Sequence, residues 1–185
     1  FGGYIDEYRM SKTARYTSNF TPTSSEFADD DNTQALLHFD GTNGDTTTVE
    51  GETPRQLSTW NNGGFTGTSS GVFNNALQLS AGGTNGYIEF PSSFEFDDNV
   101  ACTVEFRFKI SDGGTSNRTT KLFSTQGINS NSFPTSSNHL TLHTYADGNL
   151  YFTHDGNENN LGNPGTGFHH IAMQYDGTGS FHLWL

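Results

Sequence analysis

The sequence is short of cysteine, of basic residues and of long apolar runs. It has one cysteine, Cys102, so an internal disulfide cannot form, and 8 Lys and Arg stand against 20 Asp and Glu for a formal net charge of −12. Phosphate binding needs cationic surface, so we expect no nucleic-acid partner. No apolar run approaches the roughly 20 residues of a membrane-spanning helix, so we expect no membrane insertion.

Helical periodicity is missing as well. No segment repeats apolar residues at i, i+3, i+4 and i+7 over a helical length, whereas short alternating runs are common. Turn signals such as Asp147-Gly148 and Asp176-Gly177 separate these runs. The pattern predicts strands at residues 4–9, 35–40, 76–80, 87–90, 101–110, 121–125, 139–145, 150–154, 169–175 and 181–185.

The longest alternation, residues 101–110, predicts a strand with one buried face and one face in water. The residues expected in the core are Cys102, Val104, Phe106, Phe108 and Ile110. Those expected in water are Thr103, Glu105, Arg107 and Lys109. Many short strands at regular spacing are typical of a sandwich or jelly roll of two antiparallel sheets.

Several segments, in their order along the chain, resemble laminin G-like domains. Gly-Tyr-Ile-Asp-Glu-Tyr-Arg at 3–9 resembles the closing strand of such domains, and Leu-Leu-His-Phe-Asp-Gly at 36–41 resembles their first strand. Thr-Val-Glu-Phe-Arg-Phe-Lys at 103–109 and His-His-Ile-Ala at 169–172 resemble two later strands. Ala-Arg-Tyr-Thr-Ser-Asn-Phe-Thr-Pro at 14–22 is similar to modules repeated in tail and surface proteins of bacteriophages and bacteria. The resemblance implies a concanavalin A-like jelly roll used mainly for binding or scaffolding.

The order of these parts is unusual, because a closing-type strand comes first. Residues 1–11 are interpreted as that strand, 12–34 as a connector, and 35–185 as a laminin G-like jelly-roll domain lacking its last strands. The first strand could close a preceding module of a tandem array, insert into the next subunit, or fold back into its own sheet. We rank the tandem array first, donation second and self-closure third, and therefore expect tandem neighbours or self-association.

Catalysis is not expected. Enzymes that share the implied fold and hydrolyse β-glucans need alternating carboxylates that place an acid and a nucleophile about 5–5.5 Å apart. The nearest segment, Glu-Phe-Asp-Asp-Asn-Val at 95–100, lacks the final glutamate of either spacing. The histidines do not converge on a tetrahedral metal site. We therefore predict that the chain is not an enzyme.

Two loops carry groups suited to sugar recognition, an aromatic ring with amides or carboxylates nearby. The candidate carbohydrate-binding residues are Trp60, Asn61, Asn62, His154, Asp155 and Asn157. An aromatic residue in a loop can equally act as a lid over the core, and that alternative stays open.

A Gly-rich loop offers oxygen ligands at short intervals: Asp40, Asn43 and Asp45. Hard cations such as Ca²⁺ take such oxygen ligands, and calcium here would be structural. Alternatively, the same side chains cap turns through their own backbone hydrogen bonds.

These features together predict a non-catalytic jelly-roll module of a repetitive surface, fibre or virion protein, acting in assembly and adhesion with glycans as candidate ligands. Such a protein would be extracellular, on the cell surface or part of a virion. The alternative function is a carbohydrate-binding module of a glycan-degrading enzyme.

Removal of divalent cations tests the calcium hypothesis. If the loop at residues 40–45 holds Ca²⁺, EDTA should lower the melting temperature, because a ligand bound only to the folded state stabilises that state. Thermal unfolding followed by circular dichroism measures the effect, and re-addition of CaCl₂ is the control. A melting curve that EDTA leaves unchanged would contradict the hypothesis.

Overall fold

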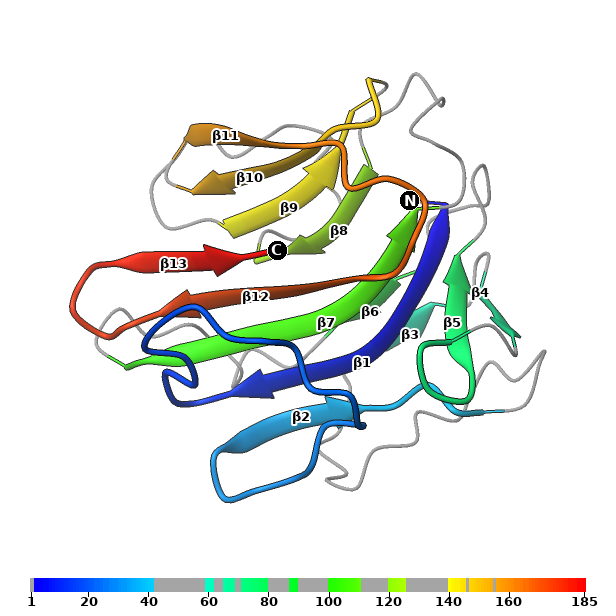
Figure 1. Cartoon of the computed structure of the whole chain (residues 1–185), viewed down its shortest axis with the longest axis horizontal. Helices are drawn as coiled ribbons and strands as arrows, with labels where there is room; N and C mark the ends of the chain where they lie inside the picture. Colours follow the sequence, from blue (N-terminus) through cyan, green and yellow to red (C-terminus); the bar gives the residue numbers. More distant parts are fainter. Residues whose placement is uncertain are drawn as a thin grey trace. The chain divides into compact units, whose positions relative to one another are not determined.

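The computed structural model describes residues 2–41, 59–61, 65–68, 71–79, 87–89, 100–110, 120–125, 140–145, 147–154 and 156–185. Within these ranges the chain is all-β, with antiparallel sheets and no helix (Figure 1). The described residues therefore contain no helix that is long and apolar enough to cross a membrane. The all-β prediction is confirmed. The chain divides into two compact units, described separately: Gly3–Lys109 with Phe168–Leu185, and a second unit built on Ile110–Gly167.

The first unit contains a seven-stranded sheet. In the order β13-β12-β7-β1-β5-β4, with β2 also paired to β1, its strands are β1 (Gly3–Ser11), β2 (Thr33–Leu37), β4 (Phe65–Thr68), β5 (Ala76–Leu79), β7 (Cys102–Ile110), β12 (His169–Tyr175) and β13 (Phe181–Trp184). β3 (Thr59–Asn61) and β6 (Tyr87–Glu89) form a separate pair. β2 ends earlier than the sequence predicts, because Phe39 has a φ of 62°, which breaks extended structure.

The second unit contains a four-stranded sheet in the order β11-β10-β9-β8. Its strands are β8 (Thr120–Ser124), β9 (Leu140–Thr144), β10 (Leu150–His154) and β11 (Asn157–Gly162). The predicted hairpin at Gly148, where φ is 77°, joins β9 to β10. β11 was not predicted, because its sequence, Asn-Glu-Asn-Asn-Leu-Gly, has no apolar alternation. Pairing of its backbone with β10 makes it a strand.

The first strand lies inside the sheet of its own chain. One side of β1 pairs with β7, while the other pairs with β5 along Gly3–Ile5 and with β2 along residues 8–11. The change of partner falls at Asp6 and Glu7, and Glu7 has a left-handed φ of 53°. This is the self-closure arrangement, which the sequence ranked behind the tandem array and donation. This pairing says nothing about family. That the strand belongs to a laminin G-like module stays a prediction.

β7 is buried on both faces except at Lys109, which is partly exposed, so the predicted exposed face is wrong for Thr103, Glu105 and Arg107. The five residues expected in the core are buried as predicted. Their opposite neighbours are buried too: the exposed fraction is 0% for Thr103 and Glu105 and 7% for Arg107. Contacts to these three residues come from the connector at residues 12–34, which the sequence did not place over this face.

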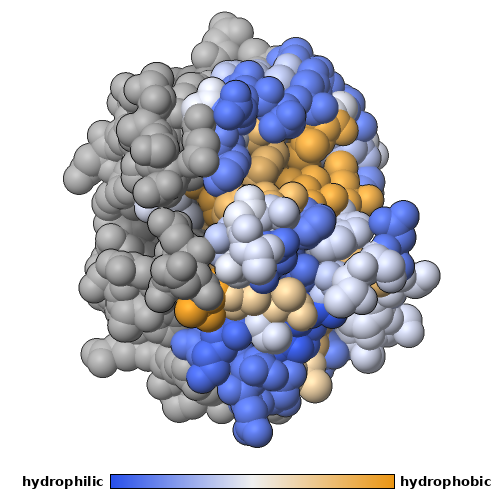
Figure 2. All heavy atoms as spheres, turned by 90° about the vertical axis from the view of Figure 1, so that its left-hand side faces the viewer, coloured by the Kyte–Doolittle hydropathy of each residue, from blue (hydrophilic) through white to orange (hydrophobic). Residues whose placement is uncertain are grey.

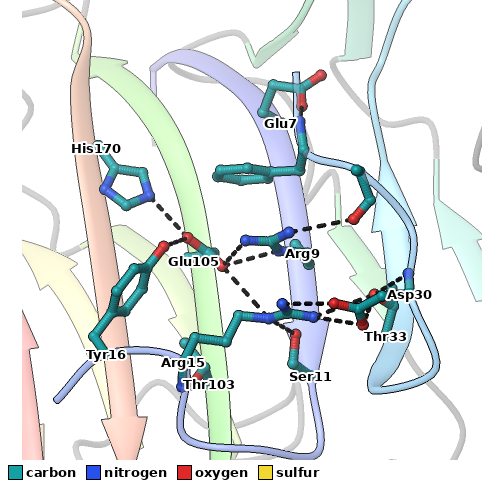
Figure 3. Close-up of polar contacts among 12 residues, drawn as sticks. Glu7, Arg9, Ser11, Arg15, Tyr16, Asp30, Thr33, Thr103, Glu105 and His170 are labelled. Carbon is teal, nitrogen blue, oxygen red and sulfur yellow. Dashed lines mark hydrogen bonds and ion pairs between the residues drawn. The ribbon is translucent and has the colours of Figure 1, made fainter. Parts of the chain in front are cut away.

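Glu105 is the centre of the polar contacts beneath the connector (Figure 3). Arg9 of β1 donates from Nε and Nη2 to its Oε1, at 2.9 and 2.7 Å. Tyr16 of the connector donates its hydroxyl to Oε2 at 2.5 Å, and Nε2 of His170 lies 3.1 Å from the same oxygen. Nε of Arg15 is 4.0 Å from Oε1. The carboxylate therefore ties β1, β7, β12 and the connector together.

Further bonds hold the same stretch of connector. Tyr16 donates its backbone N–H to Oε1 of Gln174 at 2.9 Å and accepts from Nε2 of Gln174 at 2.7 Å. Thr103 donates its hydroxyl to the carbonyl of Thr13 at 2.8 Å. The Tyr16 ring stacks on Phe20 with centroids 3.6 Å apart. Polar side chains of the sheet are thus satisfied by connector backbone, as buried polar groups must be.

The pKa of Glu105 lies below its ordinary value. Burial alone would raise it, but the contacts with His170, Arg9 and Tyr16 stabilise the ionised form and outweigh burial. Glu105 is therefore a carboxylate at neutral pH, enclosed and already paired. It has neither the access nor the raised pKa that a general acid needs.

Removing the charge of Glu105 should destabilise the fold strongly. Glu105→Gln keeps the shape of the side chain but leaves the largely buried Arg9 without its counter-charge, which should lower the free energy of unfolding by about 3–5 kcal/mol in urea titrations at pH 7. Because the folded-state pKa is lowered, the wild-type advantage is complete above pH 4.5, the ordinary pKa, and is lost as the pH falls below it.

The matched control is Asp30→Asn. Asp30 accepts from both Nη atoms of Arg15 at 2.9 Å, but its side chain is 43% exposed. An exposed ion pair contributes about 1 kcal/mol or less, so the control should cost little. An equal loss of unfolding free energy in the two variants would show that the cost does not depend on burial of the charge.

Candidate functional site

Backbone strain gathers where β1 changes partner. The described non-glycine residues with positive φ are Glu7, Phe39 and Asn74, at 53°, 62° and 40°. Each is next to, or bonded to, a carboxylate: Glu7 follows Asp6, Phe39 precedes Asp40, and Asn74 donates to Asp40. Strained backbone of this kind often marks functional sites, and here it is surrounded by titratable groups.

Asp6 is fully buried, with an exposed fraction of 0%. Its Oδ2 accepts the backbone N–H of Val72 at 2.7 Å and that of Phe73 at 3.3 Å. Its Oδ1 is buried without a hydrogen-bond partner among the described residues. Burial, with smaller contributions from Glu7 and Asp40, raises the pKa of Asp6 from 3.8 to about 6, against the two backbone bonds that lower it.

Asp40, a predicted calcium ligand, holds a neighbouring turn. Its Oδ1 accepts the backbone N–H of Asn75 at 3.1 Å, and its Oδ2 accepts from Nδ2 of Asn74 at 3.1 Å. The other two predicted ligands, Asn43 and Asp45, lie outside the described residues. Within the described ranges, no three His, Cys, Asp or Glu side chains are placed to hold a metal ion.

Glu7 and His38 form a closely bonded pair. Nδ1 of His38 lies 2.6 Å from Oε1 of Glu7, and Oε2 of Glu7 accepts the backbone N–H of Phe27 at 2.6 Å. Burial lowers the pKa of His38, but the bond to Glu7 and the charges of Glu7, Glu26 and Asp40 raise it, and the net direction is upward. The Glu7 side chain is 1% exposed and that of His38 is 14% exposed, so only the histidine reaches the surface.

His38 lines a groove of about 500 Å³, which we name the His38 groove. Its lining residues are Ser25, Glu26, Phe27, Ala28, His38 and Phe73. The Ser25 hydroxyl lies 2.9 Å from the Thr23 hydroxyl, and no bond joins it to His38. Among the described residues, the carboxylate and the histidine are therefore not joined to this serine as in a Ser-His-acid triad.

The second unit presents a different candidate, an aromatic cluster on β9 and β10. His143 and Tyr151 are directly paired, with rings stacked 5.7 Å apart at 13°. Tyr145, which follows β9, meets the Tyr151 ring edge-on at 4.6 Å. His143 is buried, whereas both tyrosines are partly exposed. The rings of the two partly exposed tyrosines therefore both contact the buried His143.

Polar groups surround these rings. Tyr151 donates its hydroxyl to Oδ2 of Asp147 at 2.7 Å and accepts from Nδ2 of Asn160 at 3.2 Å. Tyr145 donates to Oε2 of Glu158 at 2.7 Å. Together we call Tyr145, Tyr151, Asp147, Glu158 and Asn160 the tyrosine surface. Figure 2 shows hydrophilic and hydrophobic residues side by side on one face of the chain.

The structure describes only part of the predicted carbohydrate-binding set, which stays a prediction. Trp60 and Asn61 lie in strand β3 rather than in a loop, while Asn62 and Asp155 lie outside the described residues. His154 and Asn157 are paired at the end of the β10–β11 hairpin. By strand alternation, His154 points to the face opposite Tyr151.

Sequence reasoning missed the tyrosine surface although a signal was present. The predicted hairpin around Gly148 implies a register that brings His143 opposite Tyr151. The His38 groove had no such local signal, because its lining comes from separate segments at residues 25–28, 38 and 73.

Comparison of this chain with protein-family models, with curated proteins and with solved structures gives no match. Its function therefore has to be inferred from the geometry of its own residues.

Neutralising Asp6 should stabilise the protein at neutral pH. Since the folded-state pKa is raised, the stability linked to its proton is complete below pH 3.8 and is lost as the pH rises through about 6. Asp6→Asn removes this loss, so its melting temperature should exceed that of the wild type at pH 7.5, with a smaller difference at pH 4. A variant less stable than the wild type at pH 7.5 would show that the Val72–Phe73 turn requires the charge.

Proposed function

We propose that this chain is a non-catalytic binding module of a repetitive surface, fibre or virion protein, and that it acts in adhesion and assembly by contacting glycans through the tyrosine surface. Its finer fold would be the concanavalin A-like jelly roll implied by the laminin G-like resemblance. Its location would be extracellular, on the cell surface or in a virion.

The tyrosine surface is the observation that carries this proposal. Tyr145 and Tyr151 offer partly exposed rings against which the apolar face of a sugar ring can pack. Asp147, Glu158 and Asn160 supply hydrogen-bond acceptors and an amide donor beside the rings. Tyrosine gives a rigid, amphipathic contact at low entropic cost, because its hydroxyl here is already oriented by a bond.

The Asp147 carboxylate at this surface favours binding over hydrolysis. The bond from the Tyr151 hydroxyl lowers the pKa of Asp147, so this group is ionised at neutral pH and does not supply a proton. A glycosidase requires one carboxylic acid with a raised pKa to protonate the leaving oxygen. Glu105, the buried carboxylate, is enclosed by its partners.

Assembly is supported by the strand order. β13 is an outer strand of the described sheet of the first unit, and an outer strand can pair with a strand of another chain. A structural Ca²⁺ in the loop of Asp40, Asn43 and Asp45 remains part of the proposal, although Asp40 is also bonded to the turn at residues 74 and 75.

The alternative function, a carbohydrate-binding module of a glycan-degrading enzyme, would use the same tyrosine surface. The two functions differ in what accompanies the module. Repeated copies of it in the full-length protein favour the structural array, whereas an adjoining catalytic domain favours the alternative.

Binding to a glycan panel tests the proposal. The wild-type chain should bind at least one glycan, and Tyr151→Ala should weaken binding about tenfold, the equivalent of 1.4 kcal/mol. Tyr151→Phe should retain most of the affinity because it keeps the ring. Thr166→Ala, an exposed substitution in the same unit, is the control.

Each variant is also melted, so that loss of folding is separated from loss of binding. Incubation with β-1,3 and β-1,4 glucans should release no reducing sugar. Absence of binding to every glycan, or turnover of a glucan, would each refute the proposed function.

A further inference from the structure

Two carboxylates bracket the ring pair of the tyrosine surface. Tyr151 donates its hydroxyl to Asp147 and Tyr145 donates to Glu158, each at 2.7 Å, and the ring centroids are 4.6 Å apart. Burial, followed by the charges of Glu158 and Asp147, raises the pKa of Tyr145 to about 12. The bond to Asp147 and the charges of both acids raise the pKa of Tyr151. Each ring therefore lies in the field of both carboxylates.

The neighbouring basic groups do not cancel this field. Lys121 is paired with His143 and His143 with Tyr151, so the lysine is two strands from the tyrosine, about 10 Å at the usual strand spacing. Burial lowers the pKa of His143 although Glu158 raises it, so this histidine is uncharged at neutral pH. Among the described residues, no ammonium or guanidinium group lies over the ring of Tyr145 or Tyr151.

The two carboxylates are oriented and open to solvent. Oδ1 of Asp147 accepts the backbone N–H of Asn149 at 2.9 Å and Oδ2 accepts from its Nδ2 at 2.9 Å, so the exposed Asp147 is held in place. The Glu158 side chain is 38% exposed, and its Oε2 meets both Tyr145 and His143. Its Oε1 accepts no hydrogen bond from a described residue. That oxygen is an acceptor that a ligand can use.

This arrangement discriminates between ligands by charge. An anionic sugar, such as a uronic acid, would bring a third negative charge to two carboxylates that are already close to the rings. A neutral sugar can pack on the partly exposed rings but gains nothing from the two charges. A protonated amine gains from both features, because an ammonium group donates three hydrogen bonds to carboxylates and is attracted to the face of an aromatic ring.

We propose that the tyrosine surface selects amino sugars, that is, glycans whose rings carry a free, protonated amine. The ammonium group binds the carboxylates of Asp147 and Glu158, and the C–H face of the sugar packs on Tyr151, whose ring is partly exposed although His143 stacks on it. This inference rests on the proposed glycan-binding function and names the substrate class of the same surface.

The test compares three trisaccharides that differ only at C2: the β-1,4-linked trimers of glucosamine, N-acetylglucosamine and glucose. Calorimetric titration of the full chain at pH 5.5, where the amines are protonated, should give about tenfold tighter binding of the glucosamine trimer. Added NaCl should reduce this preference, because salt screens exposed charges. The double variant Asp147→Asn with Glu158→Gln should lose the preference but still bind the neutral trimers, since it keeps the rings and the acceptor oxygens.

The matched control removes two exposed acids from the first unit, Asp29→Asn with Asp31→Asn. It is needed because a chain with a net charge of −12 attracts any cation. This control should keep the tenfold preference. All variants are melted first, and where a double variant does not fold, the single variants Asp147→Asn and Asp31→Asn are compared instead.

The outcomes separate this inference from the proposed function. A preference that the tyrosine-surface variant loses and the control keeps supports the selection of amino sugars. Equal binding of the three trimers by the wild type, or equal loss in both double variants, overturns it, while binding that Tyr151→Ala weakens leaves the proposed function intact. Binding of Nα-acetyl-lysine amide as tight as that of the glucosamine trimer overturns the assignment to sugars. A wild-type chain that binds no glycan overturns both.

Discussion

The negative charge of Glu105 is the constraint on which the first unit depends. An ionised carboxylate with no exposure must be matched by positive charge and hydrogen-bond donors, and among the described strands Arg9 and His170 provide them. Tyr16 completes the set from the connector. The connector is thereby held across β7 and β12, and its later residues reach β1, where Glu7 binds the backbone of Phe27. The buried charge of Glu105 thus helps to position the connector, which forms one wall of the His38 groove.

The strands were predictable because alternation is a local property. Residues 102–110 show it without interruption, and the strand is where the pattern placed it. The polar face of this strand was predicted to be exposed because charged residues are usually in water. That rule fails where buried charges are paired with other groups. Glu105 and Arg107 illustrate this, since their partners lie far away in the sequence. β11 was not predicted because its residues show no apolar alternation. Its extended conformation comes from pairing with β10.

The candidate sites were less predictable than the strands. Loops rich in Asn, Asp and aromatic residues drew attention to Trp60 and His154, because such residues are common in sugar sites. The tyrosine surface lies on strands, with its rings in register across a hairpin, and that register was available from the turn. The His38 groove depends on contacts between β1, the connector and the turn before β5, which no local spacing reveals. Asp6 and Glu7 lie inside the predicted strand at residues 4–9, where no sequence signal marks the change of partner.

The position of β1 has a consequence for how the chain folds as it is made. β1 is synthesised before the other described strands of its sheet, and β2 follows closely, but its other neighbour, β7, is synthesised much later: Arg9 and Glu105 are 96 residues apart. Until β7 is synthesised, one edge of β1 lacks its partner strand, and Arg9 lacks its counter-ion, Glu105. Sheets closed by such distant pairing fold slowly and stay open to partners from other chains in the meantime. Crowding of nascent copies would therefore favour strand exchange between them.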